Sequence, residues 1–219
     1  MTSQLWWDVA RAGGLLGWGL LSASVLWGLA LSSRIFGRRP RPAWLLDLHR
    51  YLGGLAVIFV GVHVTAIMLD TFVSFGPLET FVPFASSWKP GAVAWGIVAL
   101  YLLLAVELTS LARSHLPLRI WRRVHYLSFG VFVFSTIHLL TAGTDSTSPA
   151  LLVVVVAVCA AVVVLTALRI TPSQRQPIAP RRTRPPTPRD PVAPGASRPP
   201  VPREPVASRP RRTPTVTAR

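Results

Sequence analysis

The chain has 219 residues, of which 51% are hydrophobic, yet its formal net charge is +15. An apolar majority and a large positive charge suit different environments, so the chain has to be divided into regions before it is classified. Its single cysteine excludes an internal disulfide.

Residues 1–170 predict one membrane domain. Five apolar runs, roughly residues 13–33, 45–69, 91–111, 124–142 and 150–170, are each close to the length of about 20 residues that a bilayer requires. Open strands are excluded there, because unpaired backbone groups are costly in hydrocarbon. The predicted fold class is therefore all-α, an integral membrane bundle of about five transmembrane helices followed by a disordered C-terminal tail.

The charged residues between the spans predict the orientation. No basic residue precedes Arg11, which favours an uncleaved first helix over a signal peptide. The positive-inside rule places the arginine-rich loops in the cytoplasm and the acidic loops outside. We expect a multi-pass protein of the cell membrane, with its N-terminus outside and its tail in the cytoplasm. The cytoplasmic set is Arg34, Arg38, Arg39, Arg41, Arg113, Arg119, Arg122, Arg123 and Arg169, and the external acids are Asp70, Glu79 and Asp145.

Four of the five histidines form two pairs within the second and fourth spans. His49 and His63 are 14 residues apart, and His125 and His138 are 13 apart. Both spans run in the same direction in the predicted topology. His49 and His125 therefore share an inner level, and His63 and His138 an outer level about 20 Å away along the helix axes. His115 lies in a basic loop and predicts a solvated side chain.

Paired imidazoles at two depths favour haem. Neutral imidazole ligates haem iron, and six-coordination takes one ligand from each side. A structural zinc site would need four ligands at one point, which two separate levels do not offer. The alternative is a haem-free membrane scaffold whose histidines serve helix packing. In an ideal helix His125 and His138 point about 140° apart. Either the fourth span is distorted, for example near Gly130, or its two haems lie on different sides.

Two segments, HRYLGGLAVIFVGVH (49–63) and RIWRRVHYLSFGVFVFSTIH (119–138), resemble the haem-bearing helices of the ferric reductase-like transmembrane family. That family includes NADPH oxidases, metalloreductases and the haem-binding membrane subunit of the bacterial methionine sulfoxide reductase system. The resemblance implies a di-haem b-type cytochrome that passes electrons from the cytoplasmic to the external side. It implies that His49 with His125 binds the inner haem and that His63 with His138 binds the outer haem.

The chain departs from that family in two respects. The family commonly has six spans, whereas five are predicted here. No flavin- or NAD(P)H-binding module is predicted, because GGLLGWG (13–19) lies in a span and favours close helix packing. The expected electron donor is therefore separate, a flavin reductase or a quinol, with a flavin or quinone from the partner as a further cofactor. The external acceptor stays open, with ferric iron, a reductase partner and oxygen as candidates.

Four charged residues near the inner level have two readings each. Arg50, Arg122 and Arg123 are candidates to pair with propionates of the inner haem, or else contact anionic headgroups. Glu107 is a candidate proton or quinone residue, or else extends toward Arg113.

Residues 171–219 predict a disordered, basic cytoplasmic tail. They include 14 prolines and 11 arginines but only two acids, which gives a net charge of +9 and leaves no apolar run to bury. The candidate roles are a solvated extension, contact with anionic lipid, and docking of an acidic electron-donor protein. Nucleic-acid binding is not expected, because no aromatic residues alternate with the arginines.

Overall fold

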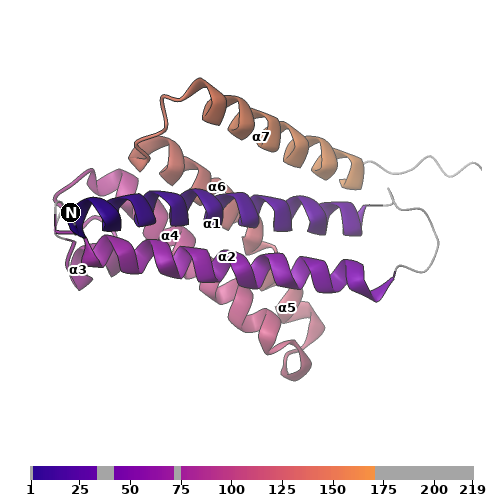
Figure 1. The fold of residues 1–219 in the computed structure, drawn as a ribbon. Helices are drawn as coiled ribbons and strands as arrows, with labels where there is room; N and C mark the ends of the chain where they lie inside the picture. The colour runs from indigo at the N-terminus through magenta and orange to yellow at the C-terminus, as the bar shows by residue number, and fades with distance from the viewer. Residues whose placement is uncertain (1, 34–41, 72–74, 171–219) are drawn as a thin grey trace, which may run out of the picture. The chain divides into compact units, whose positions relative to one another are not determined.

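A computed structural model describes residues 2–33, 42–71 and 75–170, all within one compact unit that spans Met1–Gln174. Every regular element in these ranges is helical, so the predicted all-α class is confirmed (Figure 1). In chain order the elements are α1 (Thr2–Ser32), α2 (Ala43–Leu69), α3 (Pro77–Phe81), α4 (Pro90–Leu111), the 3₁₀ turn η2 (Arg113–His115), α5 (Leu118–His125), α6 (Leu127–Ala142) and α7 (Pro149–Ile170).

Five helical segments of the described chain are long and apolar enough to cross a bilayer, which confirms the predicted number. They are Gln4–Ser32, Ala43–Leu69, Pro90–Leu111, Leu118–Ala142 and Pro149–Ile170. The first helix begins about eleven residues earlier than predicted, at Thr2. Its Arg11, which falls in this extension, makes a bidentate ion pair with Asp145, at 2.7 and 3.3 Å. A paired guanidinium is tolerated near a membrane interface, so the helix continues through it.

The helices pack as two antiparallel pairs, α1 with α2 and α4 with α6, and α7 lies against α1 (Figure 1). Trp95 of α4 stacks on Phe134 of α6 with ring centres 5.4 Å apart. Among the described helices, α2 and α6 are not a closely packed pair, although side chains meet between them. The two spans that hold the predicted histidine pairs, α2 and α5–α6, thus meet through side chains and not through close backbone packing.

The exposed surface of α7 fits lipid. Only 11% of its most apolar 18-residue window is buried inside the protein. Large apolar side chains such as Val153, Val156 and Val163 are each more than 60% exposed. In water such a surface would be an aggregation site, whereas in hydrocarbon it carries no penalty.

One buried hydrogen bond joins α1 to α6. Trp18 donates its indole Nε1–H to Thr136 Oγ1 at 3.0 Å, and both residues are buried. We expect Thr136→Val, which keeps the shape but removes the acceptor, to lower the free energy of unfolding by about 1 kcal/mol. Thermal denaturation in detergent measures this loss. The matched control is Thr166→Val, because the Thr166 hydroxyl bonds only Val162 O of its own helix and should change stability less. Equal losses would contradict a role for the interhelical bond.

Two predicted features lie outside the described residues. These are the arginines of the first loop, Arg34, Arg38, Arg39 and Arg41, and the basic tail 171–219.

Candidate functional site: two buried histidine pairs

The fourth span is interrupted directly after His125. Helix α5 ends there, Tyr126 caps it, and α6 begins at Leu127. At the junction the Phe129 amide donates to Tyr126 O, three residues back instead of four. Of the two alternatives that the 13-residue spacing left open, a distortion of the span is present, and it lies at Tyr126 and not at Gly130. Arg169 of α7 contacts the Tyr126 ring and hydroxyl, which ties the junction to a neighbouring helix.

The junction brings all four predicted histidines together in two pairs. The His49 and His125 rings have centres 6.0 Å apart and are inclined by 77°. The His63 and His138 rings have centres 6.3 Å apart and are inclined by 76°. Each pair joins α2 to the α5–α6 span. The two haems of the prediction would therefore lie on one seam and not on different sides of the fourth span.

These separations fit two imidazoles bound to one metal atom from opposite sides. A metal–imidazole bond of about 2 Å, plus about 1 Å from that nitrogen to the ring centre, puts two opposed ring centres about 6 Å apart. No group of three or more His, Cys, Asp or Glu side chains that could hold a metal ion occurs in the described ranges. The donor set is therefore two imidazoles per site, which suits a haem, whose porphyrin supplies the other four nitrogens.

Three of the histidines are held by the same device on the neighbouring helix. In each case Nδ1–H donates to a backbone carbonyl, and the residue four positions further along is glycine; we call this a carbonyl–glycine cradle. A Cβ on that glycine would lie about 3 Å from the imidazole, so only glycine lets the ring approach the carbonyl. The cradles are Ala10 O and Gly14 for His63 (2.6 Å), Ser24 O and Gly28 for His49 (3.1 Å), and Ala92 O and Gly96 for His138 (2.8 Å).

The cradles fix the chemistry of these rings. A carbonyl can only accept a hydrogen bond, so the proton lies on Nδ1 and the lone pair lies on Nε2. A neutral imidazole with its other nitrogen donating to a carbonyl is the usual form of a histidine metal ligand. His49 is further fixed by Ser24 Oγ, 3.2 Å from its Nδ1.

His125 is held differently. Its ring stacks on Trp121 one turn earlier, with centres 5.0 Å apart and planes inclined by 21°. The guanidinium of Arg113 lies 4.8 Å from the centre of the Trp121 ring. The Nδ1 atom of His125 is buried without a hydrogen-bond partner.

A cavity of about 220 Å³ opens beside the outer pair. His63 and His138 line it together with mainly apolar side chains from α1, α4 and α6. The ion pair of Arg11 with Asp145 also lines it. The outer pair therefore has accessible space next to the ligand nitrogens, and Arg11 is a cation at this site that the sequence interpretation did not single out.

An apolar cluster separates the two levels. Ala56 of α2 and Val131 of α6, each about midway between the histidines of its span, are almost fully buried. Leu21, Leu103 and Val106 complete the cluster from α1 and α4. Nothing polar from this cluster links the pairs, so the two sites are distinct.

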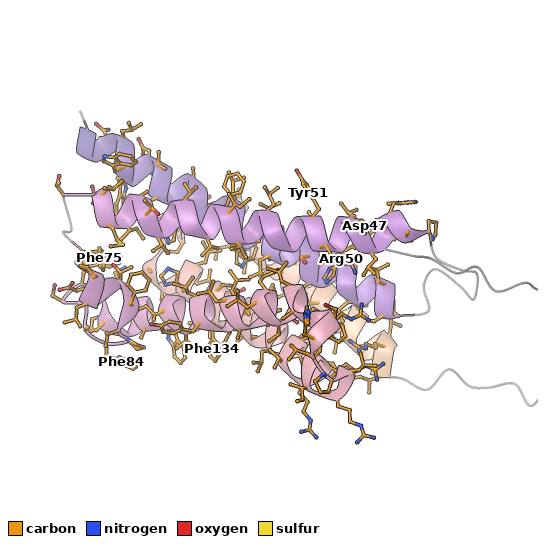
Figure 2. The ribbon with its side chains drawn as sticks, turned by 90° about the horizontal axis from the view of Figure 1, so that it is seen from below. Asp47, Arg50, Tyr51, Phe75, Phe84 and Phe134 are labelled. Atoms are coloured by element: carbon orange, nitrogen blue, oxygen red, sulfur yellow. The ribbon has the colours of Figure 1, made fainter. Side chains whose placement is uncertain are left out.

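The predicted arginines lie at the surface of the inner end. Arg50 is paired with Asp47 at 3.4 Å, and both side chains are more than 60% exposed; they lie at the end of α2 opposite to Phe75 and Phe84 (Figure 2). Arg122 and Arg123 are also exposed. Their contact with propionates stays a prediction.

The Glu107 side chain packs against Gly53 of α2. Its Oε1 atom occupies the space that a Cβ on Gly53 would fill, at 2.5 Å from that position, so Gly53 permits α4 and α2 to approach here. No interaction of Glu107 with Arg113 is among those found in the described residues.

The sequence interpretation missed the cradles, although a signal was present. Gly14 and Gly28 are 14 residues apart, the same spacing as His63 and His49 on the antiparallel neighbour. Small residues four positions before them, Ala10 and Ser24, repeat with the same period. The close helix packing predicted for GGLLGWG is present at Gly13 and Gly17, where a Cβ would lie 3.2 Å from His63 N and 3.0 Å from Val60 Cγ2 of α2; Gly14 in addition admits the His63 ring.

The fold and the site together define an all-helical membrane protein with two separate histidine pairs suited to metal ligation. The family described as ferric reductase like transmembrane component matches residues 13–136, more than half of the chain and the region that holds both pairs except His138. The chain therefore belongs to the ferric reductase-like transmembrane family. Membership indicates membrane electron transfer. No curated protein and no solved structure matches the chain.

Proposed function

We propose that the protein is a di-haem b-type cytochrome that carries electrons across the membrane. His49 and His125 hold the inner haem, and His63 and His138 hold the outer haem. The bound iron supplies one-electron chemistry. The protein provides two imidazoles per site, fixes the tautomer of three of the four through the cradles, and surrounds the sites with mainly apolar side chains.

The observation that carries this proposal is the duplicated pair geometry. A packing histidine needs one hydrogen-bond partner, and a carbonyl on a neighbouring helix would suffice for it. Packing alone gives no reason for the ring centres to meet at 6.0 and 6.3 Å at two levels. Ligation of one metal atom per pair accounts for both separations.

We further propose the direction of transfer and the partners. Arginines gather at the His49 end of the described helices, and Asp70, Glu79 and Asp145 at the His63 end, so the inner end faces the cytoplasm. The described residues form helices and short connections without a flavin- or nicotinamide-binding fold, and we propose a flavoprotein or a quinol as the electron donor. The acceptor is external, either a reductase partner or a small oxidant that reaches the outer pair.

Purification from cells supplied with haem tests the proposal. We expect about two haems b per chain by the pyridine haemochrome method, and a Soret band that shifts on reduction with dithionite. If the purified protein is folded and monodisperse but colourless, and stays colourless after incubation with hemin, the protein is a haem-free scaffold instead.

A further inference from the structure

His125 has no carbonyl–glycine cradle. The spacing of the other cradles indicates which residues of α4 lie at the corresponding position. The His138 cradle is Ala92 O with Gly96. Along α1 the second cradle follows the first after 14 residues. The same step along α4 leads from Ala92 to Val106 and from Gly96 to Ser110. Ser110 thus occupies the glycine position of a fourth cradle.

A carbonyl–glycine cradle cannot form at this place. Ser110 has a Cβ where the other cradles need none. The Thr109 hydroxyl donates to Ala105 O at 2.7 Å and also lies 3.1 Å from Val106 O, the carbonyl at the matching position, so it competes for that carbonyl. The fourth imidazole therefore needs a different acceptor.

Three buried polar atoms without a hydrogen-bond partner belong to residues of α4 and α5. They are Ser110 Oγ, Trp121 Nε1 and His125 Nδ1; the other two such side-chain atoms in the described ranges, on Ser22 and Asp70, belong to α1 and the end of α2. Helices α4 and α5 are in contact. The Trp121 indole can only donate, whereas a serine hydroxyl can accept two hydrogen bonds and donate one. Ser110 is the one member of the three that can accept from both rings.

We propose that the Ser110 hydroxyl, which has no hydrogen-bond partner in the structure, turns to accept the Nδ1–H of His125 and acts as its positioning residue. This inference rests on the proposed function, because the bond matters through the Nε2 atom that it aims at the inner haem. The Trp121 ring fixes the plane of the imidazole by stacking, and the hydroxyl fixes its rotation. The outer pair is held by two carbonyls, and with this bond the inner pair would be held by one carbonyl and one hydroxyl.

Single-pair backgrounds test this directly. In His138→Ala, which retains only the inner pair, we expect Ser110→Ala to raise the rate of haem loss to apomyoglobin about 10-fold or more. It should also move the midpoint potential of the remaining haem to more positive values, because the imidazole loses basicity with its acceptor. In His125→Ala, which retains only the outer pair, the same change should alter neither quantity.

Two further variants separate positioning from general packing. Ser110→Thr keeps the hydroxyl and should restore both the potential and the retention of the inner haem. Ser22→Ala removes another buried, unpartnered hydroxyl and should leave both unchanged. If the protein binds two haems and Ser110→Ala leaves the inner haem unaltered, the Ser110 inference is wrong and the cytochrome proposal stands. Absence of haem from the unmodified protein would overturn the proposed function itself.

Discussion

Substitution of His63 by alanine should reduce the haem content from about two per chain to about one, with the inner haem retained. His63 and His138 are the ligands of one site, and an apolar cluster of Ala56 and Val131 separates them from the inner pair. Removing one of the two histidines that would hold the outer haem should therefore release that haem without disturbing the other. The pyridine haemochrome assay on the purified variant gives the ratio directly.

The pairing is tested by combining substitutions. His63→Ala and His138→Ala should each remove the same haem, so the double variant should resemble either single variant. His49→Ala with His63→Ala should abolish haem binding, because one ligand of each pair is lost. Haem content that stays at the original level in His63→Ala or in His138→Ala would show that the assigned pairs are wrong.

A ligand exchange gives a second readout on the same atom. His63→Met would keep a side chain able to ligate the iron, and a histidine–methionine haem site has a higher reduction potential than a bis-histidine site. We expect one of the two steps in a redox titration to move to higher potential while the other stays. Circular dichroism of each variant controls for loss of fold.

The sequence patterns predicted the helical architecture well because a bilayer permits few other backbone structures. Backbone groups in hydrocarbon must be paired within the segment, so five apolar runs can only be five helices. Their length and charge also placed His49 and His63 at different depths. The first helix begins earlier than predicted because Arg11 pairs with Asp145, which lies in a connection more than 130 residues further along the chain. A local sequence pattern contains no information about such a contact.

The histidine residues were recognisable from sequence, but their supports were not. Ligand spacing along one helix is local information, whereas a cradle joins a carbonyl of α1 or α4 to a ring of α2 or α6. The break in the fourth span shows the same limit. Gly130 was the natural position for it on helix propensity, yet Gly130 faces Leu102 within a regular helix. The junction lies instead at Tyr126, where Arg169 of α7 contacts the ring.

Substitution of a cradle glycine should lower haem retention about as strongly as substitution of a histidine ligand. A Cβ on Gly96 would lie 2.8 Å from both Nδ1 and Cε1 of His138. The imidazole would have to move away from Ala92 O, which loses the hydrogen bond that orients it. We expect Gly96→Ala to weaken retention of the outer haem about 10- to 100-fold, the usual effect of losing a partner behind a metal ligand.

Matched glycines show whether this effect is specific. Gly91 lies on the same helix with nothing within 4 Å of its Cβ position, so Gly91→Ala should retain both haems. Gly28→Ala, whose Cβ would lie 3.1 Å from His49 Cε1, should weaken the inner haem and spare the outer one. Alanine is the better helix former by up to about 1 kcal/mol, so thermal stability of the apoprotein should not fall in parallel with haem affinity. Equal haem loss in Gly91→Ala and Gly96→Ala would mean that the cradle does not position the ligand, because both substitutions add the same methyl group to one helix and only Gly96 faces a histidine.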